Sequence, residues 1–224
     1  MKKSWLVPCL LFLLNACSKQ SDNGPEVIVE PPYPYAIKMD TITRGGLWNL
    51  MTGSSKKQVY DSIQKEQHIR YLAITGYIPT ALTDIQNRFE LYTTLLLDEN
   101  KGTASGIQFY FENDKIKSIY LNDGTRLNRW PLSGNVAIQT GAAVQGIYDQ
   151  LTAIQKNPLF SKKFERISLF SKNIQKPFDD RNMEISNRWE LSSNSKGPKT
   201  IYTATLVFTN DKLDSIYTRQ EQYH

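Results

Sequence analysis

Two adjacent pairs of carboxylates are the side chains best suited to acid–base chemistry in this chain of 224 residues. A glycosidase needs one carboxylic acid to donate a proton and one carboxylate to act as nucleophile or base. The pairs are Asp98-Glu99 and Asp179-Asp180. Neighbouring side chains on a strand point to opposite faces, and turn-forming residues flank both pairs. We therefore expect solvated loop charges, and a carbohydrate-active enzyme using Asp179 or Asp180 is only the third functional hypothesis.

Histidine and cysteine, which serve as metal ligands, bases and nucleophiles, are scarce. The chain has two histidines, His68 and His224, and two cysteines, Cys9 and Cys17. A zinc site needs several ligands in register, and a hydrolytic triad needs a base beside its nucleophile. The sequence contains no Gly-x-Ser-x-Gly elbow and no glycine-rich phosphate loop ending in Lys-Ser or Lys-Thr. We expect a non-enzymatic protein with no metal and no cofactor, and His68 as a solvated or a loop residue.

Cys17 has the surroundings of a lipid attachment site. Two lysines near the start precede an apolar stretch over residues 5–14, and Leu-Asn-Ala stands directly before the cysteine. This is the layout of a secretory signal, and its apolar part is too short to span a membrane. The segment resembles the lipobox of bacterial lipoproteins, in which the signal is cut before a cysteine that becomes acylated. The resemblance implies a signal peptide over residues 1–16 and lipidation of Cys17.

Lipidation would place the protein at a bacterial outer membrane. Loss of residues 1–16 removes two lysines, which lowers the formal net charge from +5 to +3. Two or three acyl chains anchor a protein firmly, because each buried CH₂ contributes about 0.8 kcal/mol. A serine directly after the cysteine, here Ser18, is similar to the sorting signals of outer-membrane lipoproteins. Surface lipoproteins of Bacteroidota carry acidic residues close behind the cysteine, and the first acidic residue here is Asp22. We expect a protein facing the periplasm or the cell exterior, on a flexible tether over residues 17–39.

Three blocks of sequence recur in the same order, which indicates an internal duplication. The blocks share a Thr-Gly followed by a hydrophobic-Tyr-Asp motif, an Arg-aromatic-Glu-Leu motif, and the run Phe-x-Asn-Asp-Lys-x-x-Ser-Ile-Tyr. The matching ranges are 52–63 with 140–151, 88–91 with 188–191, and 111–120 with 208–217.

The first two blocks predict a helix and a strand in each copy. Ser54 or Ser55 can cap a helix that carries Val59 and Ile63 on one face, four residues apart. The second copy lacks a hydroxyl residue at this place, so the start of its helix is less well defined. Apolar residues alternate over residues 89–97, which predicts a strand.

The third block predicts a hairpin in each copy, with turns at residues 113–114 and 210–211. Strands that follow helices indicate an α+β fold. We predict two tandem repeats, each with helices packed on one face of an antiparallel sheet of three or four strands. The modules are expected at residues 40–131 and 132–224, with a joint at Trp130-Pro131.

The motif Gly53-x-Ser-Lys-x-Gln-Val-x-x-x-Ile63, with the strand and hairpin that follow it, resembles the BamE-like and β-lactamase-inhibitor-protein-like superfamily. The resemblance covers residues 45–121 and, more weakly, 136–218. The loop over residues 68–85 is longer than in that family, and the second cap is degenerate. The resemblance implies a binding or envelope-assembly role, because members bind proteins or outer-membrane components.

Two groups of residues are candidates for the binding surface. Tyr92 and Tyr110 share the outward phase of the expected strands, where they form either a recognition face or the contact between modules. Lys162, Lys163 and Arg166 lie among phenylalanines and form either a surface for acidic partners or the wet side of an amphipathic segment.

The expected partners follow from these features. They are the membrane, through the N-terminal lipid, and an envelope protein, while the oligomeric state stays open. The mild positive charge has no basic runs, so no nucleic acid is expected. The first hypothesis is a scaffold or assembly protein, and the second is an inhibitor or ligand-sensing protein of the envelope.

Overall fold

The computed structural model of the chain describes residues 34–75, 81–194 and 200–223. The expected signal peptide, Cys17 and most of the expected tether lie outside these residues. No helix in the described ranges is long and apolar enough to cross a membrane.

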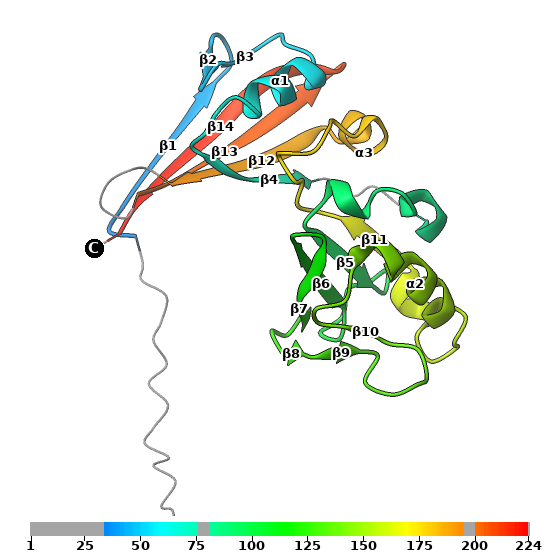
Figure 1. Cartoon of the computed structure of the whole chain (residues 1–224). Coiled ribbons are helices and arrows are strands. Elements are labelled where there is room, and N and C mark those ends of the chain that lie inside the picture. Colours follow the sequence, from blue (N-terminus) through cyan, green and yellow to red (C-terminus); the bar gives the residue numbers. More distant parts are fainter. Residues whose placement is uncertain (1–33, 76–80, 195–199, 224) are drawn as a thin grey trace, which may run out of the picture. The chain divides into compact units, whose positions relative to one another are not determined.

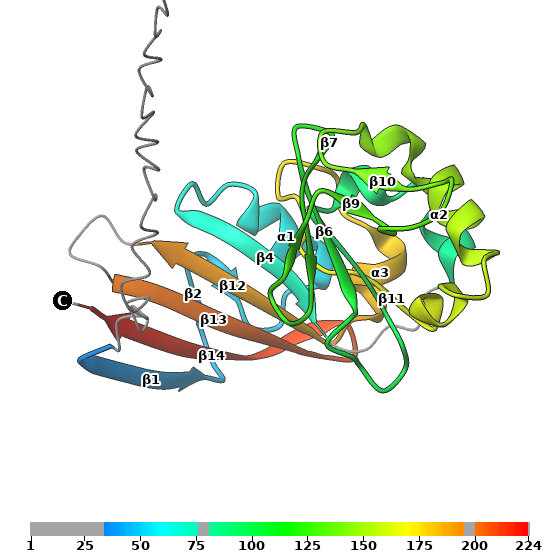
Figure 2. The ribbon, with the colours of Figure 1, turned by 90° about the horizontal axis from the view of Figure 1, so that it is seen from below.

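The first sheet has five antiparallel strands in the order β1-β14-β13-β12-β4. Figure 2 shows β1, β14, β13 and β12 side by side. One face of this sheet is apolar and buried, with Trp189, Leu191, Leu206 and Phe208 in the core. The strand bounds are β1 Ala36–Ile42, β4 Ile69–Thr75, β12 Arg188–Asn194, β13 Thr200–Thr209 and β14 Lys212–Gln222.

Helix α1 (Lys56–Ile63) lies beside the first sheet (Figure 1). It begins at Ser55, whose hydroxyl accepts from the Gln58 N–H while the Gln58 side chain accepts from the Ser55 N–H. This capping box satisfies two backbone donors that a helix start leaves open. The predicted helix with Val59 and Ile63 on its buried face is therefore confirmed. The other elements beside this sheet are β2 Gly46–Leu47, β3 Leu50–Met51 and α3 Asp180–Ile185.

The second sheet also has five strands, in the order β11-β5-β6-β7-β8. Its core includes Trp130, whose ring packs edge-to-face against Phe109 and Phe160 at centroid distances of 5.9 Å each. The strand bounds are β5 Thr94–Asp98, β6 Ile107–Glu112, β7 Lys115–Leu121, β8 Arg126–Leu127 and β11 Arg166–Leu169. The elements that pack beside it are β9 Arg129–Trp130, β10 Ile138–Gln139, α2 Ile147–Gln155 and the 3₁₀ turn Ser161–Phe164.

Backbone hydrogen bonds join the two sheets along residues 170–172, which continue β11. On one side, Ile74 donates to the carbonyl of Phe170 at 3.0 Å and Lys172 donates to that of Leu72 at 2.8 Å. On the other side, the Thr93 N–H donates to the Ser171 carbonyl at 2.7 Å. This short segment therefore holds β4 of the first sheet against the start of β5 in the second.

Both predicted hairpins are confirmed. Asn113 and Asp114 have φ of 51° and 57°, and Asn210 and Asp211 have φ of 50° and 59°. Two successive positive φ angles define a type I′ turn, which matches the twist of the flanking strands. Each hairpin also has one register shift, between Tyr110 and Phe111 in β6 and between Val207 and Phe208 in β13.

Each hairpin pairs with the loop before a helix from the other half of the chain. The Gly53 N–H donates to the Leu213 carbonyl at 2.8 Å, and the Leu213 N–H donates to the Ser54 carbonyl at 2.9 Å. Gly141 and Ala142 make the same pair of bonds with Ile116, at 2.7 and 2.9 Å. The matched blocks therefore come together across the chain rather than within one copy.

The prediction of an α+β fold in two tandem repeats is wrong. The described residues are mostly strand with three short α-helices, and each main sheet has five strands instead of three or four. β1 begins before the first expected module and β4 lies within it. They nevertheless pair with β14 and β12, which belong to the second expected module. Short-range periodicity predicts the hairpins and the first helix, but which strand pairs with which depends on contacts between distant residues.

Three smaller expectations are also corrected. Residues 89–97 do not form one strand, because Phe89–Leu91 is a 3₁₀ turn and β5 begins at Thr94. Residues 36–39 belong to β1 rather than to the tether. The expected joint at residues 130–131 is no module boundary, since β9 and β10 pair across it. The remaining 3₁₀ turns are Leu82–Ile85 and Val144–Gly146.

Candidate binding groove

An open groove of about 940 Å³ is lined by residues of both sheets, among them β4 of the first and β6 of the second. Tyr71 comes from β4 and Tyr110 from β6, so we call it the tyrosine groove. The segment that joins the two sheets forms part of its wall. Further lining residues are Phe89, Thr94, Phe111, Phe170, Asn173 and Gln175.

Tyr71 and Tyr110 combine exposed ring surface with tethered hydroxyl groups. Each residue is 37% exposed. The Ser171 hydroxyl donates to the Tyr71 oxygen at 3.1 Å, and the Tyr110 hydroxyl donates to Gln108 Oε1 at 2.7 Å. Partial burial raises the pKa of Tyr71; the Ser171 hydrogen bond opposes this rise, and the nearby Glu190 and Tyr110 add to it. Both tyrosines line the same groove.

A chain of hydrogen bonds supports Tyr110 from behind. Gln108 Nε2 donates to Asn122 Oδ1 at 3.0 Å, and Asn122 Nδ2 donates to Asp98 Oδ2 at 2.9 Å. The ring of Tyr120 packs edge-to-face on Tyr110 at 5.8 Å. A side chain held in this way loses little rotamer freedom when a partner binds.

Asp98 is the end point of that chain and is buried, which corrects its expected place in a solvated loop. Its carboxylate accepts from the Thr103 N–H at 3.1 Å, the Thr103 hydroxyl at 2.8 Å and the Glu99 N–H at 2.8 Å. Burial alone would raise the pKa of Asp98, but these hydrogen bonds and the charge of Lys163 have the larger, opposite effect. The pKa therefore lies below its ordinary value, and the carboxylate stays ionised. Asp98 is a structural anchor.

Charges of both signs line the tyrosine groove. Glu112 pairs with Lys117 at 2.8 Å, and Glu90, Asp114 and Lys176 also contribute to the wall. No histidine or cysteine is among the described lining residues, so the hydroxyls of the groove have no imidazole or thiol beside them. The groove therefore offers charged and hydrogen-bonding groups around aromatic side chains.

Tyr92 lines the tyrosine groove together with Tyr110, but its side chain is buried and not exposed as predicted. It is only 2% exposed, and its hydroxyl donates to Asp179 Oδ2 at 2.7 Å. Arg88 donates to the same carboxylate oxygen. Burial and the neighbouring Asp179 raise the pKa of Tyr92 above its ordinary range. Asp179 is thus a buried partner of Arg88 and the cap of α3, not a solvated acid.

A buried ammonium group lies behind the groove. Lys172 is 3% exposed, with Nζ 5.2 Å from the ring centre of Tyr60 and 5.7 Å from that of Tyr92. It donates to the carbonyls of Asn173 at 3.0 Å and Lys176 at 3.3 Å. Burial lowers the pKa of Lys172 to about 8, although Asp179 acts in the opposite direction.

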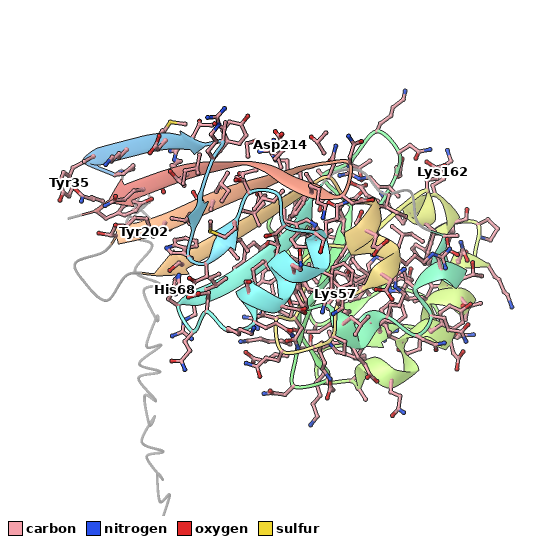
Figure 3. All side chains as sticks on the ribbon, turned by 90° about the horizontal axis from the view of Figure 1, so that it is seen from above. Tyr35, Lys57, His68, Lys162, Tyr202 and Asp214 are labelled. Atoms are coloured by element: carbon pink, nitrogen blue, oxygen red, sulfur yellow. The ribbon has the colours of Figure 1, made fainter. Side chains whose placement is uncertain are left out.

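The predicted basic surface does not join Tyr110. Lys163 contacts Glu99 at 2.7 Å and Ser105 at 2.7 Å, Arg166 lies half-buried on β11, and none of the three residues lines the groove. Lys162 is exposed, and Figure 3 places it at the opposite end of the molecule from Tyr202.

His68 and the pair Asp179-Asp180, which the sequence singles out, lie outside the groove. His68 is a loop residue, as expected, in the turn before β4, and it is half-buried against Trp48 with ring centres 4.9 Å apart. Asp180 is exposed on α3, and neither it nor Asp179 lines the groove. The two acids of the third hypothesis are therefore not among the residues that line the groove.

Tyr71, Gln108 and Ser171 are groove residues that sequence reasoning missed. Tyr71 lies in the segment of residues 68–85, which the sequence marks only as longer than the corresponding loop of the BamE-like family. The apolar run Leu72-Ala73-Ile74 within it is a signal for a buried strand. Ser171 has no such signal, because its place depends on the pairing of residues 170–172 with both sheets.

No three His, Cys, Asp or Glu side chains in the described ranges gather closely enough to hold a metal ion. Comparisons with protein-family models, with curated proteins and with solved structures give no significant match to this chain. The resemblance to BamE-like modules therefore stays a prediction from sequence motifs.

Proposed function

We propose that this protein is a lipid-anchored protein of the bacterial outer membrane that binds an envelope protein through the tyrosine groove. The observation that carries the proposal is that Tyr71 and Tyr110, from two different sheets, both line one open groove. Their hydroxyls are already hydrogen-bonded to Ser171 and Gln108.

The physical argument for a protein partner is the composition of the groove. Tyrosine offers a large contact area and a hydrogen-bonding group at low entropic cost, and it is enriched at binding hot spots. Paired and unpaired charges surround the two rings, as in the polar rim of an interface. A groove of about 940 Å³ is large enough for several side chains of a partner.

Site-specific photo-crosslinking tests this function. A photoreactive phenylalanine analogue replaces Gln175, which is exposed in the groove, and in a control replaces Lys57, exposed on α1 (Figure 3). In cells of the source organism, the protein with the analogue at position 175 should give a discrete crosslinked protein that is absent for position 57. The crosslink should disappear when Tyr71→Ala and Tyr110→Ala are added. Equal crosslinks at both positions would contradict the proposal.

The identity of the captured protein separates two forms of the proposal. A barrel or assembly component would support a scaffold role, and a hydrolase would support an inhibitor. Membrane attachment has its own test, because Cys17→Ala should release the protein from the membrane fraction. Retention of the variant in that fraction would contradict lipid anchoring.

A further inference from the structure

A second pocket, of about 180 Å³, lies away from the tyrosine groove on the first sheet. Its floor is formed by neighbouring positions on three strands, Lys38 opposite Gln220 and Gln220 opposite Tyr202. Asp40 opposite Thr218 forms the next row. These side chains lie on the face of β14 opposite to Tyr217, because successive residues of a strand alternate between faces.

The hairpin of β2 and β3 places an indole against this floor. Trp48 and Asn49 occupy its two-residue turn with φ of 51° and 61°. Asparagine and glycine favour this left-handed conformation, whereas a bulky side chain rarely adopts it. The turn holds Trp48 edge-to-face against Tyr202, with ring centres 6.5 Å apart, and against His68. An aromatic residue kept in an unfavourable turn position indicates a role beyond chain reversal.

The polar groups of this pocket are available to a ligand. Within the described part of the chain, the side chains of Lys38 and Gln220 form no hydrogen bond or ion pair, and the Asp40 carboxylate accepts only from the Thr41 N–H. One cation and one anion leave the pocket without net charge. An amide supplies a donor and an acceptor together. The ligand that matches is neutral, with hydroxyl groups that both donate and accept.

We propose that this pocket binds one pyranose ring of a neutral glycan. Trp48 and Tyr202 supply the apolar walls, and Lys38, Asp40 and Gln220 supply hydrogen bonds to the sugar hydroxyls. Ligand pockets commonly combine apolar walls with a few convergent polar groups in this way. The site is separate from the tyrosine groove and does not depend on the function proposed for it.

Tryptophan fluorescence of the full-length protein in detergent tests this site directly. Trp130 and Trp189 are buried, so Trp48 is the partly exposed tryptophan of the described residues. The probes are methyl β-D-glucopyranoside, methyl α-D-mannopyranoside and N-acetylglucosamine. At least one should give a saturable change with half-saturation on the order of 1–10 mM, the range that so small a ligand reaches. Trp48→Phe should abolish the change.

Variants assign the signal to the pocket. Asp40→Asn and Gln220→Ala should each raise the half-saturation concentration at least tenfold, with unchanged circular dichroism. Tyr217→Ala, on the other face of β14, and Tyr110→Ala, in the tyrosine groove, should leave it unchanged. The proposal is overturned if none of the three sugars gives a saturable change up to about 100 mM. It is equally overturned if Asp40→Asn and Gln220→Ala, both folded, titrate as the wild type does.

Discussion

The hydroxyl of Ser171 donates a hydrogen bond of 3.1 Å to the hydroxyl of Tyr71, from a position 100 residues further along the chain. Ser171 lies on the segment that pairs with both sheets, so this bond ties the groove tyrosine to the junction of the fold. The groove and the junction are therefore one structural unit.

Ser171→Ala should lower the free energy of unfolding by about 1 kcal/mol, the usual net contribution of one hydrogen bond. The backbone bonds of residue 171 stay in place, so the sheets should remain joined. Chemical denaturation measures the change, and Ser133→Ala serves as the control, at an exposed position whose side chain makes no hydrogen bond within the described part of the chain. A loss no larger than that of the control would show that the Tyr71 contact contributes nothing.

Asp179→Ala should be the most destabilising single change near the groove. It leaves the guanidinium of Arg88 without its partner in a site where that side chain is 11% exposed. Removing one member of a buried ion pair costs about 3–5 kcal/mol. The adjacent Asp180→Ala, at an exposed position, should change stability by less than about 1 kcal/mol. Similar losses for both variants would contradict the buried ion pair.

The stability of the protein should rise between pH 8 and pH 10. The pKa of Lys172 falls from 10.5 to about 8 on folding, so the unfolded chain binds more protons across this window. Stability then increases with pH, by about 2 kcal/mol. Below pH 8 the cost of the buried ammonium is fully present. Burial raises the pKa values of Tyr60 and Tyr92, so the trend should reverse above pH 10, where these phenols ionise only in the unfolded chain.

Lys172→Met is the matched variant for this pH dependence. It removes the titrating amine and keeps a long side chain between the rings of Tyr60 and Tyr92. Urea denaturation of this variant should show no rise between pH 8 and pH 10. Identical pH profiles for the variant and the wild type would rule out Lys172 as the cause.

Gly106→Ala should disrupt the support of Tyr110. A Cβ at this position would lie 2.2 Å from Asn122 Nδ2 and 2.6 Å from Asp98 Cγ, in a buried site crowded by these groups. Moving them breaks hydrogen bonds of a buried carboxylate, which costs about 1–3 kcal/mol. Gly146→Ala, where a Cβ meets nothing within 4 Å, is the control and should change stability by less than about 1 kcal/mol. Thermal denaturation compares the two, and equal melting temperatures would contradict the crowding.

Local features of the fold follow from the sequence. The Asn-Asp turns at residues 113–114 and 210–211 and the capping box at Ser55 are each specified by a few adjacent residues, and all are present. The recurring blocks also identify positions with the same structural role in the two copies, since Gly53 and Gly141 make matching hydrogen bonds to the two hairpins.

The sheet order and the groove do not follow from local patterns. The blocks at residues 88–91 and 188–191 look alike in sequence, yet one forms a 3₁₀ turn and the other opens β12. The difference arises from pairing with distant strands. Tyr92 and Tyr110 share one sequence pattern and both line the groove, but the hydrogen bond to the buried Asp179 draws Tyr92 inward, whereas Tyr110 stays partly exposed.

The most direct test of the central claim is the crosslinking yield from position 175 in three backgrounds: unchanged, Tyr110→Ala and Tyr217→Ala. Tyr217 is 49% exposed and lies outside the groove, so it matches Tyr110 in chemistry but not in place. A groove-bound protein partner predicts that Tyr110→Ala abolishes the crosslink while Tyr217→Ala preserves it. Equal yields in all three backgrounds would contradict a binding function for the tyrosine groove.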